Sequence, residues 1–251
     1  MAEPVVAMQL FTLREQLAED YVETLKRVRE IGYDHVQLTG SLPYEAERMR
    51  EVLDGIGLGV CGIHVGGDAL QQETEHWADY ALTVGTPDLV WPWMPEEMRQ
   101  TREDWIEAAK LMDRLGARLR ELDCRLSYHN HSFEFERFDG DYGLDLLYAN
   151  SSPKNLYAEI DTYWIKHGGE DPAEYIRRYA GRQSILHVKD MADDEEQSFA
   201  EVGHGILDWD AIHEAAMDAG VEIYAVEQDQ CPGDPFESAQ KSFEFLQGLL
   251  G

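Results

Sequence analysis

Residues 208–227, DWDAIHEAAMDAGVEIYAVE, hold in one stretch the unit that decides the fold of this chain. Asp208 stands where a helix N-cap would, an amphipathic segment follows it, and Gly220 ends that segment before an apolar run at 223–227. The same order of helical segment, glycine and apolar run occurs three more times, at Gly32, Gly57 and Gly85. Repeated units of this kind predict helices that alternate with the strands of a parallel sheet.

Eight apolar runs rich in β-branched residues alternate with helical patterns, and helix start signals such as Asp20 and Thr101 stand between them. The expected strands cover residues 5–10, 35–38, 59–64, 89–93, 125–131, 156–160, 185–188 and 223–227. Since a chain of 251 residues is the usual size of one α/β barrel, we predict a single-domain (β/α)8 TIM barrel over residues 1–251. A doubly wound open sheet, the rival fold, would carry a glycine-rich phosphate turn after its first strand, where this chain has QLFTLR.

The composition indicates which partners and which compartment to expect. The 50 acidic residues outnumber the 21 basic ones, and the net charge of −29 repels nucleic acid and anionic membrane surfaces. Such a surface suits a salt-rich, halophilic cytoplasm, where about 1 M salt shortens the Debye length to about 3 Å. The chain shows no signal-peptide pattern and no apolar run near about 20 residues, so we expect a cytoplasmic protein, and a homo-oligomer is compatible with this composition. The three cysteines are widely spaced without a C-x-x-C pair, which indicates neither a disulfide framework nor a cysteine zinc site.

Polar side chains close several of the expected strands, and in a barrel of this type the functional residues sit at the C-terminal strand ends. The residues in question are His64, His129, His131, Glu134, Glu159, Asp161, His187, Lys189, Asp190, Glu227 and Asp229. Mixed oxygen and nitrogen donors without thiolate suit Mn²⁺, Mg²⁺, Co²⁺ or Zn²⁺ in an open coordination sphere. The sequence therefore predicts a catalytic divalent metal ion at this end of the barrel.

Aromatic residues near the same strand ends indicate a pocket for a sugar or cyclitol. Trp91 and Trp93 lie at the end of the fourth strand, Trp164 follows the sixth, and Tyr128 precedes the paired histidines. Aromatic rings pack against the C–H faces of such substrates, although ordinary core packing is an equally good interpretation for each tryptophan. The segment 201–209 joins the seventh strand to its helix, and His204 between two glycines could contact a ligand there, or the segment could be a simple turn.

Five motifs, in order and one strand apart, resemble the xylose-isomerase-like TIM barrels. This is the sugar phosphate isomerase/epimerase superfamily, which includes inosose dehydratases, ketose 3-epimerases and endonuclease IV. The motifs are YHNHSFEF at 128–135, EIDTYW at 159–164, LHVKD at 186–190, VGHG at 202–205 and VEQD at 226–229. The resemblance covers nearly the whole chain.

The resemblance implies one metal ion bound by residues from the last four strands. Carried over to this sequence, the ligands are Glu134, Asp161, His187 and Glu227. Many members have Glu-Asn-His where this chain has His-Asn-His, which leaves His129 as the alternative ligand on the fifth strand. Many also have Asp-x-x-His where this chain has DTYW, so an imidazole of the multi-zinc endonucleases is absent. Together with the net charge, this argues against DNA repair.

The leading functional hypothesis is a metal-dependent sugar isomerase or epimerase that works through an enediolate. Its catalytic residues would be Glu134 and Glu227 as base and acid, His129 and His131 as proton carriers or substrate binders, and Lys189 opposite the developing negative charge. The substrate would be bound by His64, Trp93, Trp164 and His204. A dehydratase or lyase that acts on a keto-inositol or a 3-keto-glycoside would use the same groups. A non-enzymatic sugar-binding barrel with a vestigial metal site is the third alternative.

Overall fold

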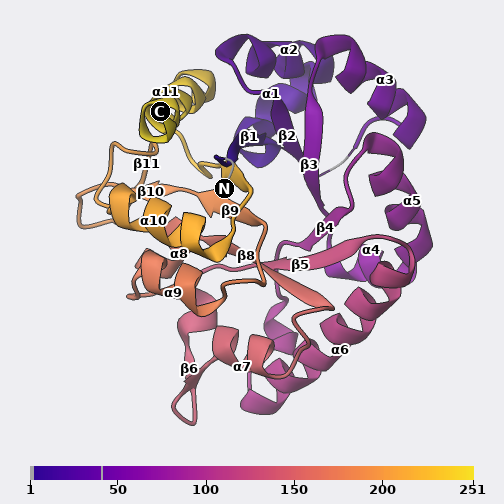
Figure 1. The fold of residues 1–251 in the computed structure, drawn as a ribbon, viewed down its shortest axis with the longest axis vertical. Helices are drawn as coiled ribbons and strands as arrows, with labels where there is room; N and C mark the ends of the chain where they lie inside the picture. Colours follow the sequence, from indigo (N-terminus) through magenta and orange to yellow (C-terminus); the bar gives the residue numbers. More distant parts are fainter. Residues whose placement is uncertain (1–2, 41) are drawn as a thin grey trace.

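The computed structural model describes residues 3–40 and 42–251, and its centre is a closed barrel of eight parallel strands. Figure 1 shows the helices arranged around the outside of these strands. Around the barrel the strands follow the order β1, β12, β9, β8, β5, β4, β3 and β2. Their bounds are β1 Val5–Gln9, β2 His35–Leu38, β3 Gly59–His64, β4 Asp88–Trp91, β5 Arg125–His129, β8 Leu156–Asp161, β9 Ile185–Val188 and β12 Ile223–Val226. The prediction of a single-domain (β/α)8 barrel is confirmed.

Helices of different lengths surround the barrel and begin and end at the expected signals. Asp20 and Asp208 accept hydrogen bonds from the first turns of α2 and α10, and Thr101 forms a capping box with Asp104 at the start of α6. Gly32, Gly57, Gly85 and Gly220 end α2, α3, α5 and α10 at positive φ, where glycine lacks the steric penalty of other residues. The helices are α1 Arg14–Glu19, α2 Tyr21–Ile31, α3 Ala46–Ile56, α4 Gly67–Gln72, α5 Thr74–Val84, α6 Arg102–Glu121, α7 Gly143–Ala149, α8 Thr162–His167, α9 Pro172–Arg178, α10 Trp209–Ala219 and α11 Pro235–Leu250.

The apolar core lies mainly between the barrel and the helices. On α6, the buried residues Trp105, Ala109 and Met112 recur at helical spacing and face the strands. Burial of a large apolar side chain such as that of Met112 contributes roughly 1.5–3 kcal/mol. Within the described residues, no helix is both long and apolar enough to cross a bilayer.

Several elements at the C-terminal end of the barrel differ from the sequence-based prediction. The fourth strand ends at Trp91 and not at 93, because Pro92 lacks the N–H that would continue the ladder. The fifth strand ends at His129, and the chain then turns into the 3-10 helix η3 (Phe133–Phe135). Short elements add to the loops here: the 3-10 helices η1 (Leu10–Leu13) and η2 (Glu96–Met98), the hairpin of β6 (Arg137–Phe138) with β7 (Asp141–Tyr142), and that of β10 (Asp190–Met191) with β11 (Phe199–Ala200).

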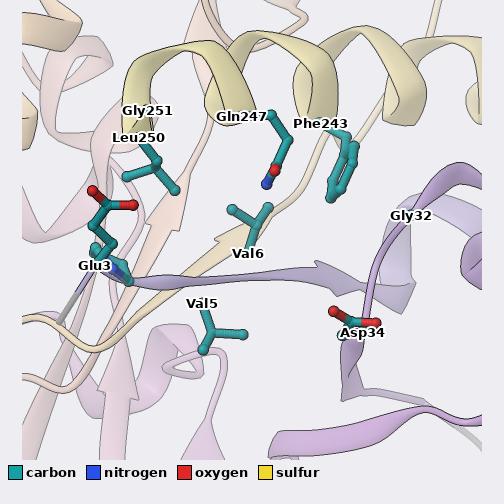
Figure 2. Close-up of a pocket in the computed structure, with 10 residues that line it drawn as sticks. Glu3, Val5, Val6, Gly32, Asp34, Phe243, Gln247, Leu250 and Gly251 are labelled. Atoms are coloured by element: carbon teal, nitrogen blue, oxygen red, sulfur yellow. The ribbon is translucent and has the colours of Figure 1, made fainter.

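A cavity of about 330 Å³ lies at the opposite end of the barrel, where β1 begins under the end of α11 (Figure 2). Glu3, Asp34 and Phe243 lie on its wall. Because β1 starts here, the cavity belongs to the N-terminal face, the end that in TIM barrels serves stability and not chemistry.

Candidate metal centre and substrate pocket

Four buried side chains from neighbouring strands meet at the C-terminal end of the barrel: His129, Asp161, His187 and Glu227. The first three end or lie in β5, β8 and β9, which lie side by side in Figure 1, and Glu227 directly follows β12. One donor atom from each lies within 4.8 Å of the others. The closest approaches are 3.1 Å from His129 Nε2 to Asp161 Oδ2 and 3.3 Å from His187 Nδ1 to Glu227 Oε2.

The chemistry of this four-residue group fits a divalent cation. Two imidazoles and two carboxylates supply nitrogen and oxygen donors in the mixture that Zn²⁺, Mn²⁺ and Co²⁺ accept. The buried Nδ1 of His129 has no hydrogen-bond partner among the described residues, so no contact commits its ring to another role. Burial favours an uncharged Glu227, yet Lys189 and His187 hold the pKa of this carboxyl well below its usual range, so Glu227 is ionised and able to bind a cation.

Lys189 is buried beside the group and makes three short contacts to carboxylates. Its Nζ lies 2.9 Å from Glu227, 2.6 Å from Asp229 and 3.4 Å from Asp161. Burial alone would lower the pKa of Lys189, but these carboxylates raise it above its ordinary value. One ammonium group against three carboxylates leaves an excess of negative charge, which a divalent ion would neutralise.

A second layer of polar side chains lies inside the barrel, next to the metal-ligand group. Glu159 accepts hydrogen bonds from Gln37 Nε2 at 2.6 Å and from His64 Nε2 at 2.7 Å, and His187 Nε2 lies 2.9 Å from it. Burial works to raise the pKa of Glu159, but His187 and His64 hold it well below its usual range. Gln9 completes the layer by donating to Gln37 Oε1.

Glu134, expected as a ligand and as a base, is not brought into the metal-ligand group. Its Oε1 accepts from the Tyr128 hydroxyl at 2.6 Å, and its Oε2 accepts from the His131 backbone N–H at 2.9 Å. Burial raises the pKa of Glu134 to about 7 in spite of these hydrogen bonds. Of the two alternatives for the fifth strand, His129 is therefore the one whose donor atom lies with Asp161, His187 and Glu227.

The His-Asn-His segment is held in place by groups on both sides. Besides the contact from Glu134 to the backbone of His131, the Asn130 side chain accepts from the Asp161 N–H at 3.1 Å. The ring of His131 stacks on Phe133, and Trp93 packs edge-on against it at 4.7 Å. Burial and the neighbouring His129 keep the pKa of His131 well below its usual range.

A pocket of about 230 Å³ opens directly above the metal-ligand group. Seven residues of its wall were candidates from the sequence: His64, Trp93, His129, His131, Lys189, Glu227 and Asp229. Trp164 lies behind this wall, 5.2 Å from the ring of His131 and 5.4 Å from Lys189 Nζ. Trp91 and Tyr128 are instead fully buried core residues, with Trp91 Nε1 donating to the carbonyl of Trp93.

His204 is exposed and is not part of the pocket wall, because its loop is fastened elsewhere. The buried Asp190 carboxylate accepts from the backbone N–H groups of Met191, Gly203, Gly205 and Leu207 and from Trp209 Nε1. A Cβ at Gly205 would collide with the Asp190 side chain. The glycines of this segment thus let its backbone pack closely around Asp190, which agrees with the interpretation of the segment as a turn. The role of His204 as a substrate contact stays a prediction.

Sequence reasoning missed both glutamines of the inner layer and the first part of the pocket wall. The missed residues are Gln9, Gln37, Phe11, Thr39 and Pro92. For the glutamines a signal was present, because each is a polar residue near the end of an apolar strand, as the histidines are. For the others, the sequence carries no comparable signal.

Comparisons with known proteins agree with the barrel fold. A family model described as the xylose isomerase-like TIM barrel matches residues 25–249. An inosose dehydratase of Lacticaseibacillus casei is 29% identical over an alignment of 170 residues, which covers 60% of this chain and 56% of that relative. Among solved structures, a sugar phosphate isomerase/epimerase from Parabacteroides distasonis has a TM-score of 0.83 at 23% identity, covering 98% of this chain and 94% of the other. The IOLI protein, solved with a bound zinc atom, has a TM-score of 0.75 at 12% identity, with coverages of 98% and 99%. The match over most of the chain, on a closed eight-stranded barrel, shows that this protein belongs to the xylose isomerase-like TIM barrel family.

Proposed function

We propose that this protein is a metal-dependent enzyme that removes a proton next to the carbonyl group of a keto-sugar or keto-cyclitol. The observation that carries the proposal is the buried group of His129, Asp161, His187 and Glu227 at the base of a small pocket. A divalent ion held there would polarise the substrate carbonyl and stabilise the negative charge that develops on its oxygen.

The residues of the pocket have separate tasks in this proposal. Lys189 donates a hydrogen bond to a substrate oxygen, because its ammonium group lies on the pocket wall beside the metal-ligand group. His131 accepts the proton, since among the described residues no carboxylate is hydrogen-bonded to its ring, in contrast to His64, His129 and His187. The half-exposed Trp93 covers one face of the substrate ring.

The charge of the pocket favours an unphosphorylated substrate. Among the described residues that line it, Lys189 is the single lysine or arginine, and three carboxylates already surround its ammonium group. The carboxylates of Glu227 and Asp229 on the same wall would repel a phosphate group.

Two outcomes follow from removal of this proton. Return of the proton at another position gives isomerisation or epimerisation, and loss of a neighbouring hydroxyl gives dehydration. The relatives named inosose dehydratase favour dehydration as the second candidate, and cleavage of a 3-keto-glycoside would be the related lyase reaction.

The experiment that tests the common step is exchange of the substrate C–H proton in deuterated solvent. A panel of unphosphorylated ketoses and inososes is incubated with protein loaded with Mn²⁺, Co²⁺ or Zn²⁺, and with chelator-treated protein as the control. Metal-dependent exchange supports the proposal, and a conjugated product absorbing in the ultraviolet identifies dehydration. Sugar binding without exchange under any metal would refute the enzyme and support a binding protein.

A further inference from the structure

Glu159 occupies an unusual position, because one buried carboxylate oxygen faces two parallel imidazole rings. Its Oε1 lies 2.7 Å from His64 Nε2 and 2.9 Å from His187 Nε2. The two rings are stacked with an interplanar angle of 6° and centroids 5.2 Å apart. All three residues are buried, so water does not compete for these contacts.

The neighbours of His187 determine which of its nitrogens carries a proton. The Gln37 amide must direct its NH2 to Glu159, because a carboxylate only accepts, and its Oε1 therefore faces His187 Nε2 at 2.6 Å. Nε2 thus has two acceptors and must be the N–H of the ring. The other nitrogen, Nδ1, points to Glu227 and Asp161, where a cation would bind.

The same reasoning applies to His64, which lies on the pocket wall and is not a member of the metal-ligand group. Its Nε2 donates to Glu159, so the neutral ring keeps a lone pair on Nδ1. Among the described residues no hydrogen bond reaches this nitrogen, and it is not enclosed by protein. His64 therefore presents a hydrogen-bond acceptor to whatever occupies the pocket.

We propose that Glu159 is a positioning residue that sets both histidines at once, turning His187 Nδ1 toward the metal ion and His64 Nδ1 toward a substrate hydroxyl. The part that concerns His187 rests on the proposed metal site, whereas the part that concerns His64 does not. Gln37 supports the arrangement because it pairs with both Glu159 and His187.

The substitution Glu159→Gln breaks this arrangement in either amide orientation. If its NH2 faces the rings, both Nε2 atoms must become acceptors and their protons move to Nδ1. If its oxygen faces the rings, its NH2 opposes the NH2 of Gln37, and Gln37 must turn its own NH2 toward His187 Nε2. In both cases the Nε2 atom of His187 no longer faces two hydrogen-bond acceptors. Asp88→Asn is the matched control, because Asp88 is also a buried acid of the barrel but pairs with Arg125 at 2.6 Å.

The first measurement uses metal-free protein labelled with ¹⁵N-histidine and long-range ¹H–¹⁵N correlation, with the His64 signal assigned from a His64→Asn variant. We expect the Nε2–H tautomer of His64 in the wild type and in Asp88→Asn, and the Nδ1–H tautomer or a mixture in Glu159→Leu, which offers His64 Nε2 no acceptor in any orientation. A wild-type His64 that carries its proton on Nδ1 overturns the proposal, even if the Glu159 variant does not fold. An unchanged His64 tautomer in a folded Glu159→Leu variant overturns it equally.

The second measurement is Zn²⁺ affinity by competition with a chromophoric chelator. Loss of a group that orients a ligating histidine typically costs about 10- to 100-fold in metal affinity, and we expect that loss in Glu159→Gln but not in Asp88→Asn. Equal affinity of the wild type and Glu159→Gln would overturn the part that concerns His187. Wild-type protein that binds no zinc would refute the proposed metal site, while the tautomer of His64 would still decide the role of Glu159.

Discussion

Asp190→Asn tests how the loop between β9 and α10 is held, and its cost can be worked out from individual hydrogen bonds. Oδ1 accepts from Met191 N at 2.8 Å and Leu207 N at 3.2 Å. Oδ2 accepts from Gly203 N at 3.0 Å, Gly205 N at 3.1 Å and Trp209 Nε1 at 2.7 Å. An asparagine keeps one of these oxygens and places an NH2 group against the donors of the other.

The less damaging orientation of the asparagine loses two hydrogen bonds to a charged acceptor. At about 1.5–3 kcal/mol each, the variant should lose about 3–6 kcal/mol of unfolding free energy. That is a large share of the roughly 5–15 kcal/mol that stabilises a typical domain. The cost arises because buried N–H groups are left without an acceptor, not because a surface charge is removed.

Urea unfolding followed by circular dichroism, at constant high salt, measures this loss as a lower midpoint with an unchanged slope. Trp209→Phe is the control, since it removes a single donor to Asp190 and should cost clearly less. A loss below about 1 kcal/mol in Asp190→Asn, or an equal loss in both variants, would refute the hydrogen-bond argument.

Four further predictions concern the site and the surface. Glu227→Gln should lower metal-dependent turnover at least about a hundredfold with an unchanged circular dichroism spectrum, and wild-type turnover would remove Glu227 from the site. Trp164→Phe should lower kcat more than it raises KM, because Trp164 packs against His131, the proposed proton acceptor, and does not line the pocket, and a steady-state assay in which KM alone rises would contradict this. Burial raises the pKa of Glu134 from 4.5 to about 7, so between these pH values the folded state holds a proton that the unfolded state has lost. The free energy of unfolding should therefore fall by up to about 3 kcal/mol as the pH rises from 4.5 to about 7. Glu134→Gln should lack that fall, and identical pH profiles of the two proteins would contradict the shift. Because the net charge is −29, raising KCl from about 0.1 to 1 M should raise Tm, and a scanning-calorimetry trace that does not move with salt would count against self-repulsion.

The barrel could be predicted from the sequence because the signals for its helices and strands are local and recur along the chain. Each helix cap depends on a few neighbouring residues, as Thr101 with Asp104 and Gly220 after α10 illustrate. The ends of the strands were less predictable, because they depend on where the ladder partner stops. The fifth strand was expected to run to 131, but its ladder with β8 ends at the pair His129 and Glu159.

The strand-five ligand could not be decided from the sequence because Glu134 lies beyond the strand. Within a strand, alternate side chains face the same side, so spacing predicts direction. Glu134 stands in η3, where the 3-10 turn directs its carboxylate to Tyr128 and to the backbone of His131. A carboxylate of the expected type and approximate position therefore points away from the other ligands.

The alternation of side chains along the strands explains why the site consists of two polar layers. On β8, Glu159 and Asp161 are two residues apart and both face the interior, so Asp161 joins the metal-ligand group while Glu159 lies one layer deeper. His187 on the neighbouring strand β9 and Lys189 directly after that strand follow the same spacing, and the register pairs His187 with Asp161. Because the deeper layer meets the ligands from below, His187 contacts Glu159 through one nitrogen and the metal-ligand group through the other. The orientation of His187 thus depends on where polar residues occur in the alternating pattern of the strands. Moving Glu159 by one position along β8 would turn its carboxylate out of the barrel.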